Sequence, residues 1–157
     1  LLVEHDHNGS FGFIINNPLN YTTNDITIEM EYDFPLYYGG PVDQENLFFV
    51  HKMGNLIPNS VQIQNDLYWG GDFKKTISLV NDKQLNVNDI KFFLGYSGWS
   101  PNQLNLEIES KSWIVKKNSN SSEIFRNKSK SLWSKKMKEL GGDFILWSNS
   151  PENPYEN

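Results

Sequence analysis

Residues 96–107 carry the side chains of this chain that are best suited to chemistry, and they read Tyr-Ser-Gly-Trp-Ser-Pro-Asn-Gln-Leu-Asn-Leu-Glu. The pattern predicts a strand that turns sharply at Gly98 and enters a capped helix. Ser100 suits the N-cap, Pro101 suits the first helical position, and Gln103 completes a Ser-x-x-Gln capping box. The N-terminus of a helix presents free backbone N–H groups, so this entry favours an anion or another polar ligand.

A capped helix over a core does not explain why the polar side chains of Gln103 and Glu107 flank an aromatic turn. They lie four residues apart and therefore share one face, beside an apolar stripe formed by Leu104 and Ile108. The stripe is typical of a helix that covers a core. The position of the polar pair next to Trp99 indicates a functional use.

Ser97 is a candidate nucleophile, because a serine between a strand and a helix occurs in the Gly-x-Ser-x-Gly elbow of hydrolases. In residues 95–99, however, Trp99 stands where the second glycine belongs, and its bulk would crowd the turn. A hydrolase would also need a base beside Ser97, for which His51 and Glu107 are the candidates. This reaction remains an alternative, and we assign no catalytic residue.

Two glycine-rich turns are further candidates for a binding site. Neither Gly39-Gly40-Pro41 nor Gly70-Gly71 is followed by Gly-Lys-Ser/Thr, so neither is a P-loop. Turns that need positive φ are the favoured interpretation, although Gly70-Gly71 opens a helix and could form an anion nest. We expect both turns to converge with residues 97–103. The candidate ligand-binding residues are Gly39, Gly40, Pro41, Gly70, Gly71, Ser97, Gly98, Trp99, Gln103 and Glu107.

The sequence gives little indication of a metal site and excludes cysteine chemistry. The chain has no cysteine, which excludes disulfides, thiolate metal sites and a cysteine nucleophile. His5 and His7 form a pair without further clustered ligands, which favours an exposed hairpin tip. His51 ends an apolar strand and is predicted to be hydrogen-bonded there. We therefore predict no metal and no cofactor.

Charge is unevenly distributed along the chain, whose net charge is −5. Residues 1–110 carry −9, residues 111–140 carry +7, and residues 141–157 carry −3. The basic stretch is typical of solvated helix faces, and the alternative is a surface for nucleic acid or an acidic partner. No helix-turn-helix or aromatic RNA-binding signature supports nucleic acid in particular.

The elements that must position these residues alternate between hairpins and strand–helix units. Strands are predicted at 1–5, 11–16, 36–38, 47–51, 61–63, 67–69, 90–96, 113–115 and 144–147. Helices are predicted from Phe73, with Asp72 as N-cap, from Pro101 to about 110, and at 131–140, where Gly141-Gly142 ends the helix. A short helix is also predicted at 22–30, although Ile26 and Ile28 alternate as they would in a strand. The order predicts one α+β domain over residues 1–157, built on a curved mixed sheet with 90–96 at its centre.

Length and hydropathy agree with a single globular domain, since 157 residues can bury a substantial core. No apolar run reaches the length of a membrane span or resembles a signal sequence. We expect a cytoplasmic protein that does not bind membranes.

At these residues the chain resembles the YqgE/AlgH family of bacterial proteins, whose members are often labelled transcriptional regulators. The matching blocks span the chain in order: Glu4-His5, Phe11-Gly12, Asn16-Asn17-Pro18, Tyr38 to Val42, Leu47 to His51, Trp69 to Asp72, Gly95 to Trp99, Gln103-Leu104, Glu107, Trp113, Trp133, Leu140 to Gly142 and Pro151 to Asn157. The family usually has a basic residue at Asn17, glycine at Asn102, glutamate at Asn105 and often alanine at Ser97.

The resemblance implies a bifurcated β-sheet folded into a pseudo-barrel and flanked by helices. It implies no established catalytic activity, and alanine at Ser97 in relatives weakens the case for a serine nucleophile. Members begin with another strand, which this chain is expected to lack. The leading hypothesis is a non-enzymatic cytoplasmic regulatory protein that binds a small anionic ligand or a protein partner. The alternatives are a hydrolase using Ser97 and a nucleic-acid-binding protein using residues 111–140.

Overall fold

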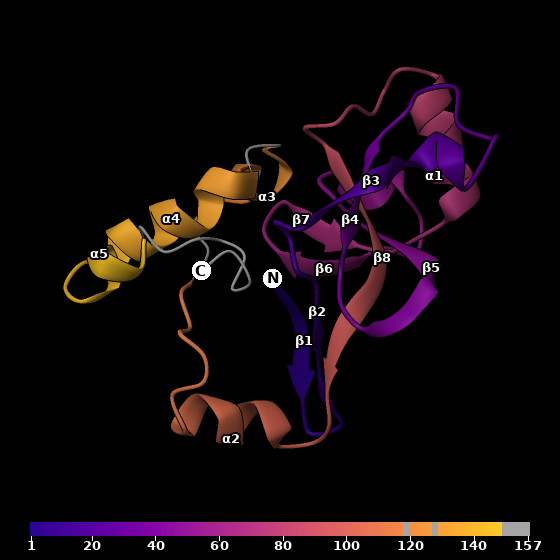
Figure 1. The fold of residues 1–157 in the computed structure, drawn as a ribbon. Coiled ribbons are helices and arrows are strands. Elements are labelled where there is room, and N and C mark those ends of the chain that lie inside the picture. The colour runs from indigo at the N-terminus through magenta and orange to yellow at the C-terminus, as the bar shows by residue number, and fades with distance from the viewer. Residues whose placement is uncertain (118–119, 127–128, 149–157) are drawn as a thin grey trace.

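Strand β8 (Ile90–Trp99) forms the centre of the molecule and carries its most apolar sequence. The computed structural model describes residues 1–117, 120–126 and 129–148, with only the backbone described for 129–131. Within that part, β8 is buried along most of its length and pairs with three other strands (Figure 1). The predicted central strand is therefore confirmed, and it extends three residues further than its apolar run.

Eight strands form one sheet in the order β1-β2-β8-β5-β7-β6, with β4 also on β8 and β3 on β4. The remaining strands are β1 (Leu2–Asp6), β2 (Gly9–Gly12), β3 (Pro18–Thr22), β4 (Pro35–Tyr38), β5 (Val42–His51), β6 (Val61–Gln64) and β7 (Leu67–Trp69). The β4–β8 pair is parallel and every other pair is antiparallel. Two-residue turns at His7-Asn8 and Asn65-Asp66 join β1 to β2 and β6 to β7 as hairpins.

The sheet forks along one edge of β8. Strand β5 pairs with β8 from Ile90 to Tyr96 and occupies one edge. On the other edge, β4 pairs with residues 92–94 and β2 pairs with residues 97–99. Because two strands share one edge in succession, the sheet divides and curves until it is nearly closed into a barrel. The mixed, bifurcated sheet of an α+β domain is thus confirmed.

Gly39 and Gly40 lie at this fork and allow β4 to leave β8. The Gly39 N–H donates to the Leu94 carbonyl at 2.9 Å. A Cβ on Gly39 would lie 2.1 Å from the Gly95 carbonyl oxygen, and one on Gly40 would lie 2.3 Å from the Tyr96 carbonyl. Gly40 also has φ +154°. Only glycine fits this close approach of two backbones.

Two aromatic-rich cores flank β8, because successive strand residues point to opposite faces. Phe92 belongs to the core that also holds Leu36, Phe49 and Val80, beneath α1. Phe93 belongs to the other core, where its ring stacks on Phe13 with centroids 4.6 Å apart.

The helices lie outside the sheet. They are α1 (Phe73–Asn81), α2 (Gln103–Glu109), α3 (Ser122–Phe125), α4 (Ser129–Leu140) and α5 (Phe144–Trp147), with short 3-10 turns at Thr23–Asp25 and Gly54–Leu56. Asp72 caps α1 as predicted, accepting the Lys75 N–H at 2.9 Å. Ile124 and Phe125 insert α3 into the second core. Helix α4 packs mainly on α5 (Figure 1).

Several local predictions are wrong, and the strand predicted at 11–16 is one of them, since β2 ends at Gly12. Residues 113–115 are not a strand, because no described strand lies beside them to form a ladder. Residues 144–147 form α5, in which the Ser148 N–H donates to the Phe144 carbonyl at 3.1 Å. The predicted helix at 22–30 is reduced to one 3-10 turn, because Thr23 is hydrogen-bonded to Phe34 in both directions. Gly98 makes no turn and lies within β8.

None of the helices in the described ranges is long and apolar enough to cross a membrane.

Candidate functional site

Glu107 organises the segment that the sequence singled out. Its Oε2 accepts the indole N–H of Trp99 at 2.9 Å and that of Trp113 at 2.6 Å, and its Oε1 accepts the Gln103 amide at 2.9 Å. The hydrogen bonds from Trp113, Gln103 and Trp99 hold the pKa of the Glu107 carboxyl below its usual value. The predicted pairing of Gln103 with Glu107 is present in the structure.

The entry into α2 differs from the predicted geometry. The chain turns at Pro101 and Asn102, and Asn102 is the N-cap residue with φ +63°. Asparagine tolerates this left-handed conformation better than most residues. Gln103 Oε1 accepts the Ser100 N–H at 2.9 Å, so one half of the capping box remains although Ser100 is not the N-cap. Leu104 is buried as expected, whereas Ile108 is exposed.

Through these hydrogen bonds, Gln103 and Glu107 stabilise the local structure. Three N–H groups converge on one carboxylate, so most of its acceptor capacity is used within the protein. The Trp99 and Trp113 rings meet edge to face at 5.8 Å. Glu107 therefore fastens the end of β8, helix α2 and the following segment to one another.

A groove of about 630 Å³ borders this loop. Its lining residues are Glu4, Asp6, Asn8, Gly9, Ser10, Phe11, Val42, Tyr96, Gly98, Trp99, Ser100 and Pro101. The charged side chains among them, Glu4 and Asp6, are both acidic and would repel an anion. The electrostatics of this groove do not favour a small anionic ligand.

Ser97 has no base within reach among its described partners. Its Oγ donates to the Gly39 carbonyl at 3.3 Å. His51 pairs with Ile90 at the opposite end of β8, which is seven residues or about 23 Å away along the strand. Glu107 is engaged by the two indoles and the amide of Gln103. A nucleophile and base are therefore not assembled at Ser97.

His51 is fully buried and is held by three groups. Its Nδ1 accepts the Met53 N–H at 3.1 Å, which places the ring proton on Nε2. That nitrogen faces the Gly70 carbonyl at 3.1 Å and Ser60 Oγ at 3.0 Å, and Ser60 donates its own proton to the Ile57 carbonyl at 2.7 Å. Burial lowers the pKa of His51 to about 4. His51 is thus a hydrogen-bond donor to Ser60 and cannot act as its base.

The structure brings together two of the three predicted turns. Gly39-Gly40 packs directly on residues 95–97 at the fork of the sheet. Gly70 and Gly71 lie instead beside Ile57 and Ser60, near His51. The predicted convergence is therefore present only where Gly39 and Gly40 meet Ser97, and it does not extend to Gly70-Gly71.

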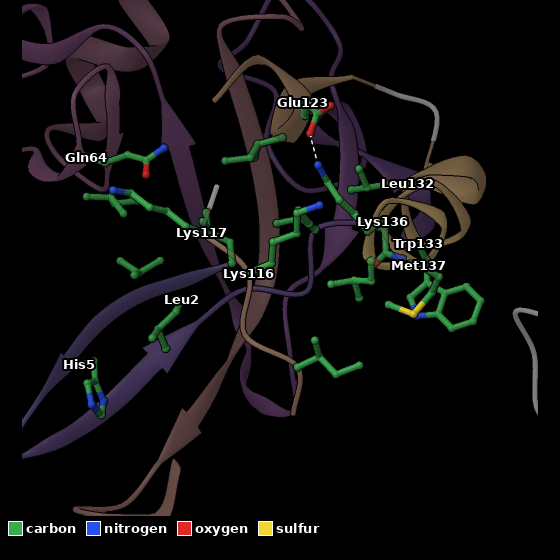
Figure 2. A pocket seen from close by; sticks show the side chains of 18 of the residues that line it. Leu2, His5, Gln64, Lys116, Lys117, Glu123, Leu132, Trp133, Lys136 and Met137 are labelled. Atoms are coloured by element: carbon green, nitrogen blue, oxygen red, sulfur yellow. Dashed lines mark hydrogen bonds and ion pairs between the residues drawn. The ribbon is translucent and has the colours of Figure 1, made fainter. Parts of the chain in front are cut away.

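A second cavity, of about 660 Å³, lies between β1 and α4, and we call it the β1–α4 cavity (Figure 2). Leu2 and His5 lie on its β1 side, and Trp133 and Met137 project from α4 (Figure 2). Its lining residues are mostly apolar on both walls: Leu1, Leu2, Val3, Glu4, His5, Ile15, Asn16, Ile63, Gln64, Ile114, Lys116, Lys117, Glu123, Ile124, Leu132, Trp133, Lys136, Met137 and Leu140.

The charges around the β1–α4 cavity are largely paired. Glu123 binds Lys135 and Lys136, and Glu139 binds Lys116, Lys135 and Lys136. The hydrogen bonds from Lys135 and Lys136 lower the pKa of Glu123 to about 2. This network fixes α4 against α3 and against the segment after α2.

Sequence reasoning missed this cavity because its walls come from six separate segments of the chain. Two signals pointed towards it. The run Trp113-Ile114-Val115 has strand composition but no strand partner in the described residues. The apolar spacing of Trp133, Met137 and Leu140 required a surface for α4 to face.

Comparison with known proteins places the whole fold in one family. The AlgH-like family profile (DUF179) matches residues 1–145. A UPF0301 protein of Cytophaga hutchinsonii is 39% identical, covering 100% of this chain and 87% of that relative. A UPF0301 protein of Chlorobaculum parvum is 37% identical, covering 100% of this chain and 84% of that relative.

Solved structures show the same fold at lower identity. The solution structure of the AlgH protein from Pseudomonas aeruginosa superposes with a TM-score of 0.73 at 20% identity, covering 97% of this chain and 83% of that chain. A crystal structure from Corynebacterium diphtheriae gives a TM-score of 0.73 at 23% identity, covering 96% of this chain and 81% of that chain. The profile match and the full-length relatives show that the chain belongs to the AlgH-like UPF0301 family.

Proposed function

We propose that this protein is a non-enzymatic regulatory protein that acts by binding a protein partner at the β1–α4 cavity. The observation that carries the proposal is the cavity itself, which has apolar walls on both sides and paired charges at its margin. Apolar surface surrounded by polar groups is characteristic of protein interfaces.

Several large apolar side chains in the C-terminal half of the chain are exposed. Val115 is 71% exposed, Trp113 is 49% exposed and Ile114, which lines the cavity, is 44% exposed. On α5, Leu146 is 73% exposed. Large exposed apolar side chains are a frequent feature of interaction sites.

Other classes of function receive less support from the geometry. Ser97 lacks a base, and His51 is a buried donor. In the basic segment, Lys116, Lys135 and Lys136 are neutralised by Glu123 and Glu139, which weakens a continuous cationic surface for nucleic acid. The mixed charges favour a protein partner over a free anion.

The position of the cavity suggests how binding would produce a regulatory output. One wall belongs to the sheet, whereas the other belongs to the segment after α2 and to α4, which packs mainly on α5. A partner seated between the walls would favour one arrangement of α4 and α5 relative to the sheet.

Affinity capture with matched variants tests this proposal. Ile114→Asp places a charge in the cavity wall, and Ile28→Asp places the same charge at a residue that is 97% exposed and does not line the cavity. We expect one cellular protein to bind the wild type and Ile28→Asp but not Ile114→Asp. The purified partner should then bind the purified wild type with the same ranking.

Two results would contradict the proposal. One is that no captured protein distinguishes Ile114→Asp from Ile28→Asp. The other is that the captured protein, once purified, binds all three forms equally. Circular dichroism of each variant shows beforehand that it is folded.

A further inference from the structure

The groove beside the β1–β2 hairpin, whose lining includes Glu4, Asp6, Phe11, Tyr96 and Gly98, has no part in the proposed function, and we call it the hairpin groove. It lies where β1, β2 and the end of β8 run side by side (Figure 1). Its volume is about 630 Å³, and Glu4 is the only residue that it shares with the lining of the β1–α4 cavity. The two sites can therefore be tested separately.

The strand register places the lining side chains on one face of the sheet. Glu4 lies opposite Phe11, and Phe11 lies opposite Gly98, so the three residues form one row across β1, β2 and β8. Asp6 and Tyr96 each lie two residues along their strand from a member of this row, and they share its face because strand side chains alternate. Gly98 has no side chain, and a Cβ there would lie 3.3 Å from the Tyr96 ring. The face is thus hollow beside this ring, with two carboxylates on the β1 side.

The charge of this region has one sign. Residues 1–51 contain eight aspartates and glutamates and no lysine or arginine, and residues 92–110 also lack lysine and arginine. All the residues that line the hairpin groove belong to these two ranges. Every ion pair found in the described ranges lies elsewhere, and Asp6 accepts only the neutral N–H of Asn8, at 2.7 Å, so Glu4 and Asp6 keep unpaired charges. A groove lined by charge of one sign attracts an occupant of the other sign, here a cation.

Aromatic rings in the same groove indicate which cation fits it. Phe11 and Tyr96 meet edge to face with centroids 5.5 Å apart, and both side chains are only partly buried. The face of an aromatic ring attracts a cation. A guanidinium group is planar, so it stacks on such a ring while its N–H groups donate to carboxylates, whereas an ammonium group is a strongly hydrated point charge. The combination of rings and carboxylates therefore favours arginine over lysine.

We propose that the hairpin groove binds an arginine side chain that a partner protein presents on an extended segment. The guanidinium group lies beside the Tyr96 ring, in the hollow at Gly98, and its N–H groups face the carboxylates of Asp6 and Glu4. Val42 contributes apolar surface to the same groove, which suits apolar side chains that flank the arginine. Charge complementarity decides the class of occupant, because these carboxylates repel acidic segments and free anions.

NMR titration of the nitrogen-15-labelled protein with a short peptide tests the hairpin groove. The probe is an end-blocked Leu-Ser-Arg-Ser-Leu peptide, and its control carries citrulline, which has the shape of arginine without the charge. The arginine peptide should shift the amide resonances of Gly9, Gly98 and Tyr96 in a saturable way. The citrulline peptide should bind at least about fivefold more weakly, because it loses both the ion pairs and the cation–π contact. A lysine peptide should bind more weakly than the arginine peptide, because its ammonium group does not stack.

Asp6→Asn is the decisive variant. It removes one charge and keeps an oxygen that accepts the Asn8 N–H, so the turn is preserved while the affinity for the arginine peptide should fall by about twofold to fivefold. Glu29→Gln makes the same change of charge at an exposed residue outside the groove and should bind the peptide as the wild type does. Gly98→Val places a side chain in the hollow and should abolish the saturable shifts. The spectrum of Gly98→Val shows whether it is folded, and Asp6→Asn tests the groove independently of it.

Four results would overturn the arginine site. The first is the absence of saturable shifts in the groove, including the case in which the shifts map to another acidic segment such as residues 25–33. The second is equal binding of the arginine and citrulline peptides, which would mean that apolar contacts alone hold the peptide. The third is equal binding of the lysine peptide, which would exclude stacking on a ring. The fourth is equal weakening by Asp6→Asn and Glu29→Gln, which would mean that only the net charge of the protein matters.

The outcome is independent of the proposed function, because Asp6 and Gly98 do not line the β1–α4 cavity and Ile114 does not line the hairpin groove. A partner that depends on Ile114 would support the regulatory role whether or not the arginine peptide binds. Peptide binding that depends on Asp6 would establish the arginine site whether or not such a partner is found.

Discussion

Acid should destabilise this protein through His51, and the replacement His51→Gln should remove that effect. His51 is fully buried, and burial lowers its pKa to about 4 from an ordinary value of 6.5. Glutamine preserves much of the bonding, because its oxygen can accept the Met53 N–H and its amide can donate to the Gly70 carbonyl.

The direction and size of the effect follow from proton linkage. Between pH 6.5 and 4 the unfolded chain binds a proton at His51 that the folded chain does not, so stability falls as the pH falls. Each pKa unit corresponds to about 1.4 kcal/mol, which gives a loss of about 3 kcal/mol across the window and about 2 kcal/mol by pH 5. Above pH 6.5 the neutral ring contributes its full stability.

Urea unfolding of the wild type and of His51→Gln at several pH values between 7.5 and 4.5 measures the contribution of His51 to the pH dependence of stability. Carboxylates with lowered pKa, including Glu123 and Glu107, are common to both proteins and cancel in the comparison. The wild type should lose about 2 kcal/mol more than the variant between pH 7.5 and pH 5. NMR titration of the His51 ring provides a second measurement, with the resonance identified by single substitution of His5 and His7.

Equal pH dependence of the two proteins would refute this reasoning, provided that both unfold cooperatively at pH 7.5. A His51 ring that titrates near pH 6.5 in the folded wild type would refute it independently.

Three further predictions follow from the fork, the Glu107 cluster and the second core. Gly40→Ala should lower the free energy of unfolding in urea by at least about 2 kcal/mol, because the added Cβ meets the Tyr96 carbonyl. The control Gly142→Ala has open space around it and should lower it by about 1 kcal/mol. Equal losses in the two variants would contradict the close approach of backbones at the fork. Glu107→Gln should move the indole N–H resonances of Trp99 and Trp113 in NMR spectra, because both donate to this carboxylate, and unchanged resonances would show that the cluster does not form. Burial lowers the pKa of Lys91 to about 8. The free energy of unfolding of the wild type should therefore rise by up to about 3 kcal/mol relative to that of Lys91→Met as the pH increases from 8 to 10.5. Parallel pH profiles of stability for the two proteins would exclude a buried ammonium group at this position.

Much of the local structure was predictable because its signals are contained in a few neighbouring residues. Asp72 caps α1, and the turns at His7-Asn8 and Asn65-Asp66 close hairpins, since each depends on local backbone geometry. The spacing of Gln103 and Glu107 placed both on one helix face, where their side chains meet.

Where a segment has no strong local signal, its neighbours decide its structure. Residues 113–115 and 144–147 are apolar and suited to strands, but neither has a strand beside it in the described residues. A strand requires a partner for its backbone groups, so the second segment closes into the local hydrogen bonds of α5.

The sequence by itself determined the family, the α+β class and most turns, and it selected residues 96–107 as a candidate site. The tertiary structure alone decided what those residues do. Pairing with β2 keeps Gly98 in an extended strand, and Trp113 completes the set of donors that occupies Glu107. The β1–α4 cavity likewise exists only after folding, because it is lined both by β1 and by residues of 114–117 and 132–140, which are more than 100 residues away in the sequence. Local pattern cannot encode such a juxtaposition, since it depends on the path of the whole sheet.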